Sequence, residues 1–146
     1  MTKCWIFDID GTVANGDHRL HHIKKTPKDW TAYFAACAGD APIPHVVELF
    51  RACVQTHPVV FVSGRSDECR EDTLSWLEGT LDGIAATLYM RKAGDYRPDD
   101  VIKIELLEQL RADGWDPIMV FDDRDRVVEA WRRAGVPCAQ VAPGDF

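Results

Sequence analysis

Two carboxylates beside a glycine, Asp8 and Asp10 followed by Gly11, are the residues of this sequence best placed for chemistry. They come directly after an apolar run, residues 5–7, which suits a strand covered on both faces. Because a charged side chain is rarely found inside a core, we expect Asp8 at the carboxyl end of that strand. Open parallel sheets bind their ligands at this end, and a glycine lets the backbone turn close to a ligand. The stretch therefore predicts a ligand-binding site with two acidic groups.

Two other interpretations of this motif are a calcium-binding loop and an ordinary turn. A calcium loop needs a third acidic or amide ligand and then a distant glutamate. Thr12, Val13 and Ala14 follow instead, so the calcium loop is excluded. An ordinary turn stays open on this motif alone.

Strand-like and helix-like segments alternate along the chain. We expect strands at about 3–8, 59–62, 86–90, 118–121 and 138–141, and helices at 44–55, 66–77, 98–111 and 127–134. This alternation indicates the α/β class, with a parallel sheet and helices on both of its faces. Three of the strands end in polar clusters, namely Asp8-Ile9-Asp10, Ser63-Gly64-Arg65 and Asp122-Asp123-Arg124. These ends can converge on one edge of the sheet.

Capping residues and apolar stripes refine three of the expected helices. Between the first two strands, Thr26 would cap a helix that carries Trp30, Tyr33, Phe34 and Cys37 on one face. Ser66 would cap the second helix of the sheet, and Gly79 would follow its end. The helix at 98–111 would bury Val101, Ile104, Leu107 and Leu110, with Lys103 on its polar side.

Composition limits the classes of function. The 146 residues suit one domain, and the formal net charge of −7 argues against a broad, nonspecific nucleic-acid surface. A basic cluster at residues 18–28, which includes His18, His21 and His22, is interpreted as a solvated loop face. No signal peptide or membrane-spanning run is visible. Five scattered cysteines predict reduced thiols in a cytoplasmic protein.

The combined pattern resembles the haloacid-dehalogenase-like (HAD) phosphatase superfamily. Its four motifs match Asp8-Ile9-Asp10-Gly11-Thr12, Ser63, Lys103 and Asp122-Asp123 in order. The resemblance implies a doubly wound, Rossmann-like parallel sheet over residues 1–146, with a small helical cap insert at about 15–44. A closer resemblance is to the 3′-phosphatase domain of bacteriophage-type polynucleotide kinase/phosphatase. It is carried by Arg19, Ser63-Gly64-Arg65, the stretches 98–103, 122–124 and 127–133, and the closing Gly144-Asp145-Phe146.

The resemblance assigns roles to the acidic residues. Asp8 would be the nucleophile that becomes an aspartyl-phosphate, and Asp10 the general acid and then the base. Mg²⁺ would be held by Asp8, Asp122 and the backbone carbonyl of Asp10, with Asp123 binding directly or through water. Hard oxygen ligands suit this ion, which would neutralise charge on the phosphoryl group.

It also implies roles for polar and basic residues. Ser63 and Lys103 would be catalytic, with Asp99 pairing with Lys103 one helical turn away. The expected substrate-binding residues are Thr12, Arg19, Gly64, Arg65, Asp99 and Arg124. Arg19 and Arg65 would hold the 3′-phosphate and the nucleotide end, because arginine grips phosphate in bidentate fashion.

The leading hypothesis is a Mg²⁺-dependent phosphomonoesterase acting on 3′-phosphate ends of DNA or RNA, or on nucleoside 3′-monophosphates. No Gly-x-x-x-x-Gly-Lys-Ser/Thr loop is present, so we expect a stand-alone phosphatase, or one whose kinase or ligase partner is a separate protein. The alternatives are a small-molecule phosphatase (a 5′-nucleotidase or a sugar phosphatase), a receiver-like phosphoacceptor module, and an inactive nucleic-acid-binding domain. A receiver places its acidic pair before the phosphorylated aspartate, which is the reverse of the order here.

Overall fold

Strand β1 (Thr2–Phe7) lies at the centre of a five-stranded parallel sheet of order β5-β4-β1-β6-β7. The computed structural model describes residues 1–146. The other strands of this sheet are β4 (Val59–Ser66), β5 (Thr87–Arg91), β6 (Trp115–Asp122) and β7 (Cys138–Gln140). Phe7, the last residue of β1, is in register with Phe61 of β4 and with Phe121 of β6, which ends one residue later. The chain therefore leaves β1 and β6 at nearly the same level, whereas β4 continues to Ser66. The α/β class and the parallel sheet expected from the sequence are confirmed.

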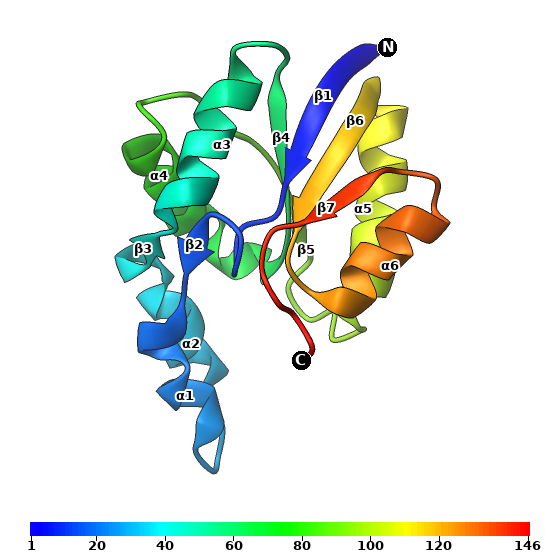
Figure 1. Ribbon diagram of the computed structural model, residues 1–146. Coiled ribbons are helices and arrows are strands. Elements are labelled where there is room, and N and C mark those ends of the chain that lie inside the picture. Colours follow the sequence, from blue (N-terminus) through cyan, green and yellow to red (C-terminus); the bar gives the residue numbers. More distant parts are fainter.

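Two pairs of helices cover the two faces of the sheet (Figure 1). One face packs against α3 (Pro44–Val54) and α4 (Arg70–Thr80), and the other against α5 (Asp99–Ala112) and α6 (Asp125–Arg133). Neighbouring residues of a strand point to opposite faces, which produces both cores from the same strands. Thus Phe7 belongs to the first core and Ile6 to the second. None of these helices has the length and apolar character needed to cross a lipid bilayer.

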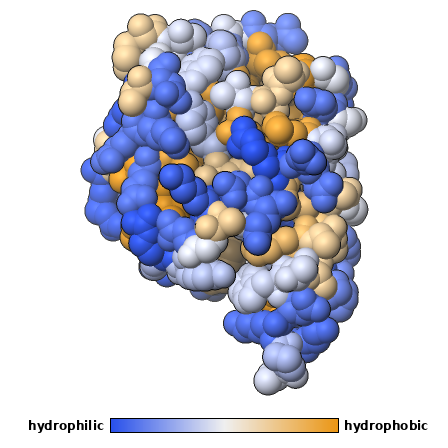
Figure 2. All heavy atoms as spheres, turned by 180° about the vertical axis from the view of Figure 1, so that it is seen from behind, coloured by the Kyte–Doolittle hydropathy of each residue, from blue (hydrophilic) through white to orange (hydrophobic).

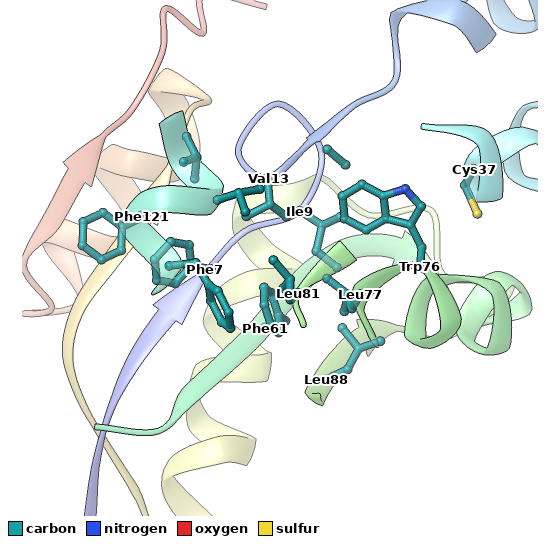
Figure 3. Packing of buried hydrophobic residues seen from close by; sticks show 14 of the residues in the cluster. Phe7, Ile9, Val13, Cys37, Phe61, Trp76, Leu77, Leu81, Leu88 and Phe121 are labelled. Carbon is teal, nitrogen blue, oxygen red and sulfur yellow. The ribbon is translucent and has the colours of Figure 1, made fainter. Parts of the chain in front are cut away.

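The first core is aromatic near the carboxyl ends of the strands. Phe7 and Phe121 lie with their ring centroids 4.7 Å apart, and Phe61 packs beside Phe7 at 6.3 Å. Figure 3 shows these rings on one face of the sheet, with Trp76 of α4 reaching toward the loop that follows β1. The indole nitrogen of Trp76 donates to the backbone oxygen of Asp40, 2.8 Å away. This contact ties the core to the segment inserted after β1.

Residues 14–43, here called the insert, project from the body below the strand ends (Figure 1). The insert contains a two-stranded antiparallel sheet, β2 (Ala14–Asn15) with β3 (Ala41–Pro42), at its base. Between these strands it forms α1 (His21–Lys24), α2 (Trp30–Ala35) and the 3₁₀ turns η1 (Asp17–Arg19) and η2 (Ala36–Gly39).

The predicted start of the helix in the insert was wrong. Asp29, not Thr26, caps α2, because its carboxylate accepts a hydrogen bond from the backbone N–H of Ala32 at 3.0 Å. The predicted apolar stripe is also divided, since Cys37 is buried whereas Trp30 is 48% exposed. The aromatic side chains of α2 therefore do not form an enclosed core.

The predicted end of α4 was also wrong. Ser66 caps the segment as predicted, by accepting from the N–H of Glu68, but its first turn is the 3₁₀ turn η3 (Asp67–Cys69). Gly79 lies inside α4. The chain instead reverses at Gly83, whose φ of +74° is left-handed and whose N–H donates to the oxygen of Glu78.

The buried face of α5 differs from the predicted one. Val101 is 39% exposed, whereas Ile102, Lys103, Leu106, Leu107 and Leu110 are buried. Lys103 therefore lies on the buried side of the helix, among apolar residues. A lysine in that position requires anionic partners.

Candidate active site

The carboxylates that end β1 and β6 meet at the sheet edge. The backbone N–H of Asp8 donates to the backbone oxygen of Phe121 at 3.0 Å. The hydrogen bonds between β1 and β6 therefore extend to the residue just before Asp122. Carboxylate oxygens of Asp8, Asp122 and Asp123 lie within 4.8 Å of one another, and all three residues are buried. The sequence placed these groups at neighbouring strand ends, and their meeting is confirmed.

Lys103 reaches this cluster from α5. Its ammonium group is 2.7 Å from Oδ1 of Asp8 and 2.8 Å from Oδ2 of Asp122. The expected pairing of Lys103 with Asp99 was wrong, because Asp99 instead pairs with Arg91 and Arg124. Lys103 is turned inward by the two buried carboxylates, whereas Asp99 stays at the surface of the pocket.

The charge of the cluster suits a divalent cation. Three ionised carboxylates and one ammonium group leave a charge of −2. Burial and the neighbouring Asp122 raise the pKa of Asp8 well above its ordinary value, although Lys103 opposes this rise. Burial likewise raises the pKa of Asp123. A set of hard oxygen donors in which like charges oppose one another fits Mg²⁺.

Outer contacts fix the orientation of these carboxylates. The hydroxyl of Thr12 donates to Oδ2 of Asp8 at 3.0 Å, and the indole N–H of Trp131 donates to Oδ2 of Asp122 at 3.1 Å. Gly11 has a φ of +79°, and a β-carbon there would strike the carboxylate of Asp123. Thr12 is fully buried and supports Asp8.

Trp131→Phe should weaken the binding of Mg²⁺ about 10- to 100-fold, because Asp122, a member of the cluster that could hold the ion, loses the donor that orients it. We also expect it to lower the free energy of unfolding by about 1–3 kcal/mol, since a buried acceptor loses a donor. A Mg²⁺ titration of activity and a urea unfolding curve measure these effects. Trp5→Phe is the matched control, because Trp5 donates to Thr56 on the exposed side of the molecule. Equal Mg²⁺ affinity in both variants would contradict the role of Trp131.

Asp10 lies outside the anionic cluster and faces two arginines. Its Oδ1 accepts from Nη2 of Arg65 and from Nη2 of Arg19, both at 2.8 Å. Burial raises the pKa of Asp10, but Arg65 and Arg19 oppose it more strongly, so the net effect is a pKa below the ordinary value. The two aspartates of the motif therefore differ in electrostatic environment, as two carboxylates with different tasks require.

Asp40, a residue that the sequence did not indicate, holds the two arginines. Its side chain is fully buried, and it accepts from Arg19 at 2.8 and 2.9 Å and from Arg65 at 2.9 Å. Nε2 of His18 lies 2.8 Å from the same carboxylate. In the sequence, Asp40 could be noticed only as an aspartate after Ala38-Gly39, and this pattern also indicates the end of a helix. Asp10, Asp40 and the two guanidinium groups form a network that is neutral overall.

The remaining predicted site residues divide into two groups. Gly64, Arg65, Asp99 and Arg124 line the pocket above the cluster. Ser63 and Arg19 are fully buried and do not line it. The hydroxyl of Ser63 accepts from the N–H of Arg65 at 3.1 Å, and the guanidinium of Arg19 lies over the ring of Tyr33. Arg124 also donates to the backbone oxygen of Phe146.

A pocket of about 610 Å³ opens above these groups. Asp8, Asp10 and Lys103 lie among its polar lining, and residues of the insert and of the loop after β5 complete its walls. This volume lies within the range of sites that hold small organic ligands.

The whole length of the chain matches a known family. Residues 2–146 match the family model described as the polynucleotide kinase PNKP phosphatase domain. The chain belongs to this family. It is therefore a HAD-type phosphatase, and the acidic cluster at the ends of β1 and β6 is the group that could bind the metal this superfamily generally uses.

Relatives of this PNKP-type phosphatase domain include longer proteins. A protein of Autographa californica nuclear polyhedrosis virus, whose name proposes a bifunctional polynucleotide kinase/RNA ligase, is 30% identical over 132 residues. The match covers 89% of this chain and 18% of the viral protein. A chain in the structure of a Pnkp1/Rnl/Hen1 complex has a TM-score of 0.80 and 30% identity, and the match covers 100% of this chain and 47% of that one. The chain thus spans less than half the length of these relatives.

The fold is shared more widely than the sequence. A class C acid phosphatase from Bacillus anthracis, solved with tungstate bound, has a TM-score of 0.69 at 14% identity. The match covers 99% of this chain and 67% of that one. At this level of identity the likeness concerns the fold of the PNKP-type domain alone.

Proposed function

We propose that this protein is a Mg²⁺-dependent phosphomonoesterase that removes 3′-phosphate from polynucleotide ends or from nucleoside 3′-monophosphates. The observation that carries this proposal is the position of Asp8. Its carboxylate belongs to the anionic cluster and also lines the pocket, next to an Asp10 held by two arginines.

In the first step, an oxygen of Asp8 attacks phosphorus, and the bond from phosphorus to the leaving oxygen breaks. Lys103 offsets negative charge of the phosphoryl group, and a Mg²⁺ ion, which Asp8, Asp122 and Asp123 would hold, would supply further positive charge there. Asp10 donates a proton to the leaving oxygen. In the second step, Asp10 takes a proton from water, which attacks the phosphorus and frees Asp8.

The arginine pair supports both roles of Asp10. In the free protein, Arg65 and Arg19 lower the pKa of Asp10 against the effect of burial, which keeps Asp10 deprotonated and able to accept a proton. An arriving phosphate dianion brings negative charge beside Asp10, and this raises the tendency of its carboxyl group to hold a proton. Because Arg19 is buried, it acts on the reaction by positioning Asp10, whereas Arg65 also borders the pocket.

The surroundings of the pocket support a polymer end as substrate. The insert forms one wall as a small lid and leaves the pocket open. The viral relative and the Pnkp1/Rnl/Hen1 chain point to kinase or ligase partners that would supply or use the processed end. All five cysteines are buried and free, which suits the reducing cytoplasm.

A phosphate-release panel tests this function. We expect Mg²⁺-dependent release from 3′-phosphorylated oligonucleotides and nucleoside 3′-monophosphates, and none with EDTA. The panel also contains nucleoside 5′-monophosphates and sugar phosphates. Faster release from either of these two classes would overturn the 3′ specificity and favour the small-molecule phosphatase.

A further inference from the structure

The insert carries an exposed aromatic ring at the edge of the pocket. Trp30 is 48% exposed, more than any other large hydrophobic residue of the insert. It lines the pocket together with Tyr33 and Phe34. Trp30 and Phe34 lie in a stacked arrangement with ring centroids 6.0 Å apart, and Tyr33 meets Trp30 edge-on at 5.6 Å. Neighbouring rings therefore fix the orientation of Trp30 while leaving part of it open.

Unpaired lysines lie on the outer part of the insert, and one of them is beside this ring. Lys24, Lys25 and Lys28 are exposed and take part in no ion pair, and Nζ of Lys28 lies 5.8 Å from the ring of Trp30. The net charge of −7 includes these three lysines, so the remainder of the chain carries −10. Figure 2 shows the insert projecting from the body, with hydrophilic residues on its outer part.

The ring connects two hollows. Trp30 and Thr31 line both the pocket above the anionic cluster and a shallower hollow of about 570 Å³ that is bordered by Lys25 and Lys28. A ligand whose end lies at Asp8 can therefore continue past Trp30 to the lysines without leaving the surface. Along this path lie, in order, the nucleophile candidate Asp8, the ring of Trp30 and the two lysines.

We propose that this path binds the last nucleotides of a single-stranded nucleic acid, with a base stacked on Trp30 and backbone phosphates beside Lys25 and Lys28. Aromatic rings interleaved with cations are the combination by which proteins bind single strands, because stacking requires an unpaired base. The acidic remainder of the chain repels a polyanion, so binding is confined to the end of the strand. This inference rests on the proposed function and adds the polymer to it.

Binding of a product-like strand tests the path without turnover. The probe is a 5′-fluorescent single-stranded oligonucleotide with a 3′-hydroxyl end, and the readout is anisotropy with the whole chain in Mg²⁺. Trp30→Ala should raise Kd about tenfold, and Trp30→Phe should restore most of the affinity because a ring remains. The double variant Lys25→Ala/Lys28→Ala should reduce the slope of log Kd against log salt by about 1.4, or about 0.7 for each lost contact.

Lys3→Ala is the matched control, because Lys3 is an exposed lysine on β1 at the opposite end of the strand from Asp8. DNA and RNA versions of the probe identify the strand that is preferred, and a blunt duplex of the same sequence shows whether an unpaired base is needed. Unchanged Kd and salt slope in the insert variants would overturn the inference. Equal affinity for the duplex would do the same.

Kinetics separate this inference from the proposed function. On a 3′-phosphorylated oligonucleotide, Trp30→Ala should raise KM about tenfold and change kcat less, with a smaller rise for a nucleoside 3′-monophosphate. If Trp30→Ala releases phosphate with an unchanged KM, the strand-binding path is overturned and the phosphatase function stands. If the protein binds the strand through Trp30 but releases no phosphate, the strand-binding path stands and the phosphatase function is overturned.

Discussion

Asp8→Asn is expected to lower phosphate release by about 10³-fold or more, on oligonucleotides and on p-nitrophenyl phosphate alike. An amide has nearly the same shape as a carboxylate but does not attack phosphorus to give an acyl-phosphate. The variant also replaces one of the three carboxylates of the anionic cluster by a neutral amide, which is a weaker ligand for a cation. Initial rates at saturating Mg²⁺ measure the loss.

The same substitution should leave the fold intact. Burial and Asp122 raise the pKa of Asp8, so the stabilising contribution of this group is complete below its unfolded pKa and is lost as pH rises through its folded pKa. Ionisation of Asp8 therefore opposes folding, and asparagine cannot ionise. In EDTA at pH 7 the variant should therefore melt at the same temperature as the parent or higher. Asp72→Asn, on the exposed side of α4, is the control for both measurements. Full turnover in Asp8→Asn would exclude Asp8 as the nucleophile.

Asp40→Ala should lower the free energy of unfolding by about 3–5 kcal/mol, because the two buried guanidinium groups then share Asp10 alone and one positive charge is left without a carboxylate. Urea unfolding measures this loss. The milder Asp40→Asn keeps the shape of the side chain and removes its charge. Arg19 and Arg65 then act on Asp10 alone, so the pKa of Asp10 falls further below its ordinary value.

With a lower pKa, Asp10 is less often protonated when it must act as an acid and is a weaker base, so kcat of Asp40→Asn should fall about 10- to 100-fold. The acidic limb of the pH–rate profile should move to lower pH, which a purely structural defect would not cause. Asp17→Asn is the matched control, because Asp17 is an exposed aspartate of the same insert that forms no ion pair. A profile that keeps its position would show that Asp40 stabilises the insert without influencing Asp10.

The sequence predicted the sheet and the meeting of Asp8 with Asp122 because both follow from local patterns. An apolar run that stops at a carboxylate marks a strand end, and parallel neighbours bring such ends together. Lys103 and Asp40 could not be placed in this way. Each is a charged residue whose buried position depends on partners that are distant in the chain. Lys103 depends on Asp8 and Asp122, and Asp40 depends on Arg19 and Arg65. Local rules for charged residues predict solvent exposure instead.

Helix boundaries in the insert and in α4 were predicted less well for a related reason. Thr26 and Asp29 both suit an N-cap, and Gly79 and Gly83 both suit a helix end. The choice between such candidates depends on tertiary contacts. One of these is the bond from Trp76 on α4 to the backbone of Asp40 in the insert, which fixes where the two segments meet.

The central position of β1 has a consequence for biosynthesis. This first strand acquires its neighbours only when β4 and then β6 exist, and the latter begins at Trp115. A nascent chain whose residues 115–122 are still inside the ribosome therefore carries Asp8 without Asp122. Such long-range pairing slows folding and postpones assembly of the acidic cluster until β6 has emerged.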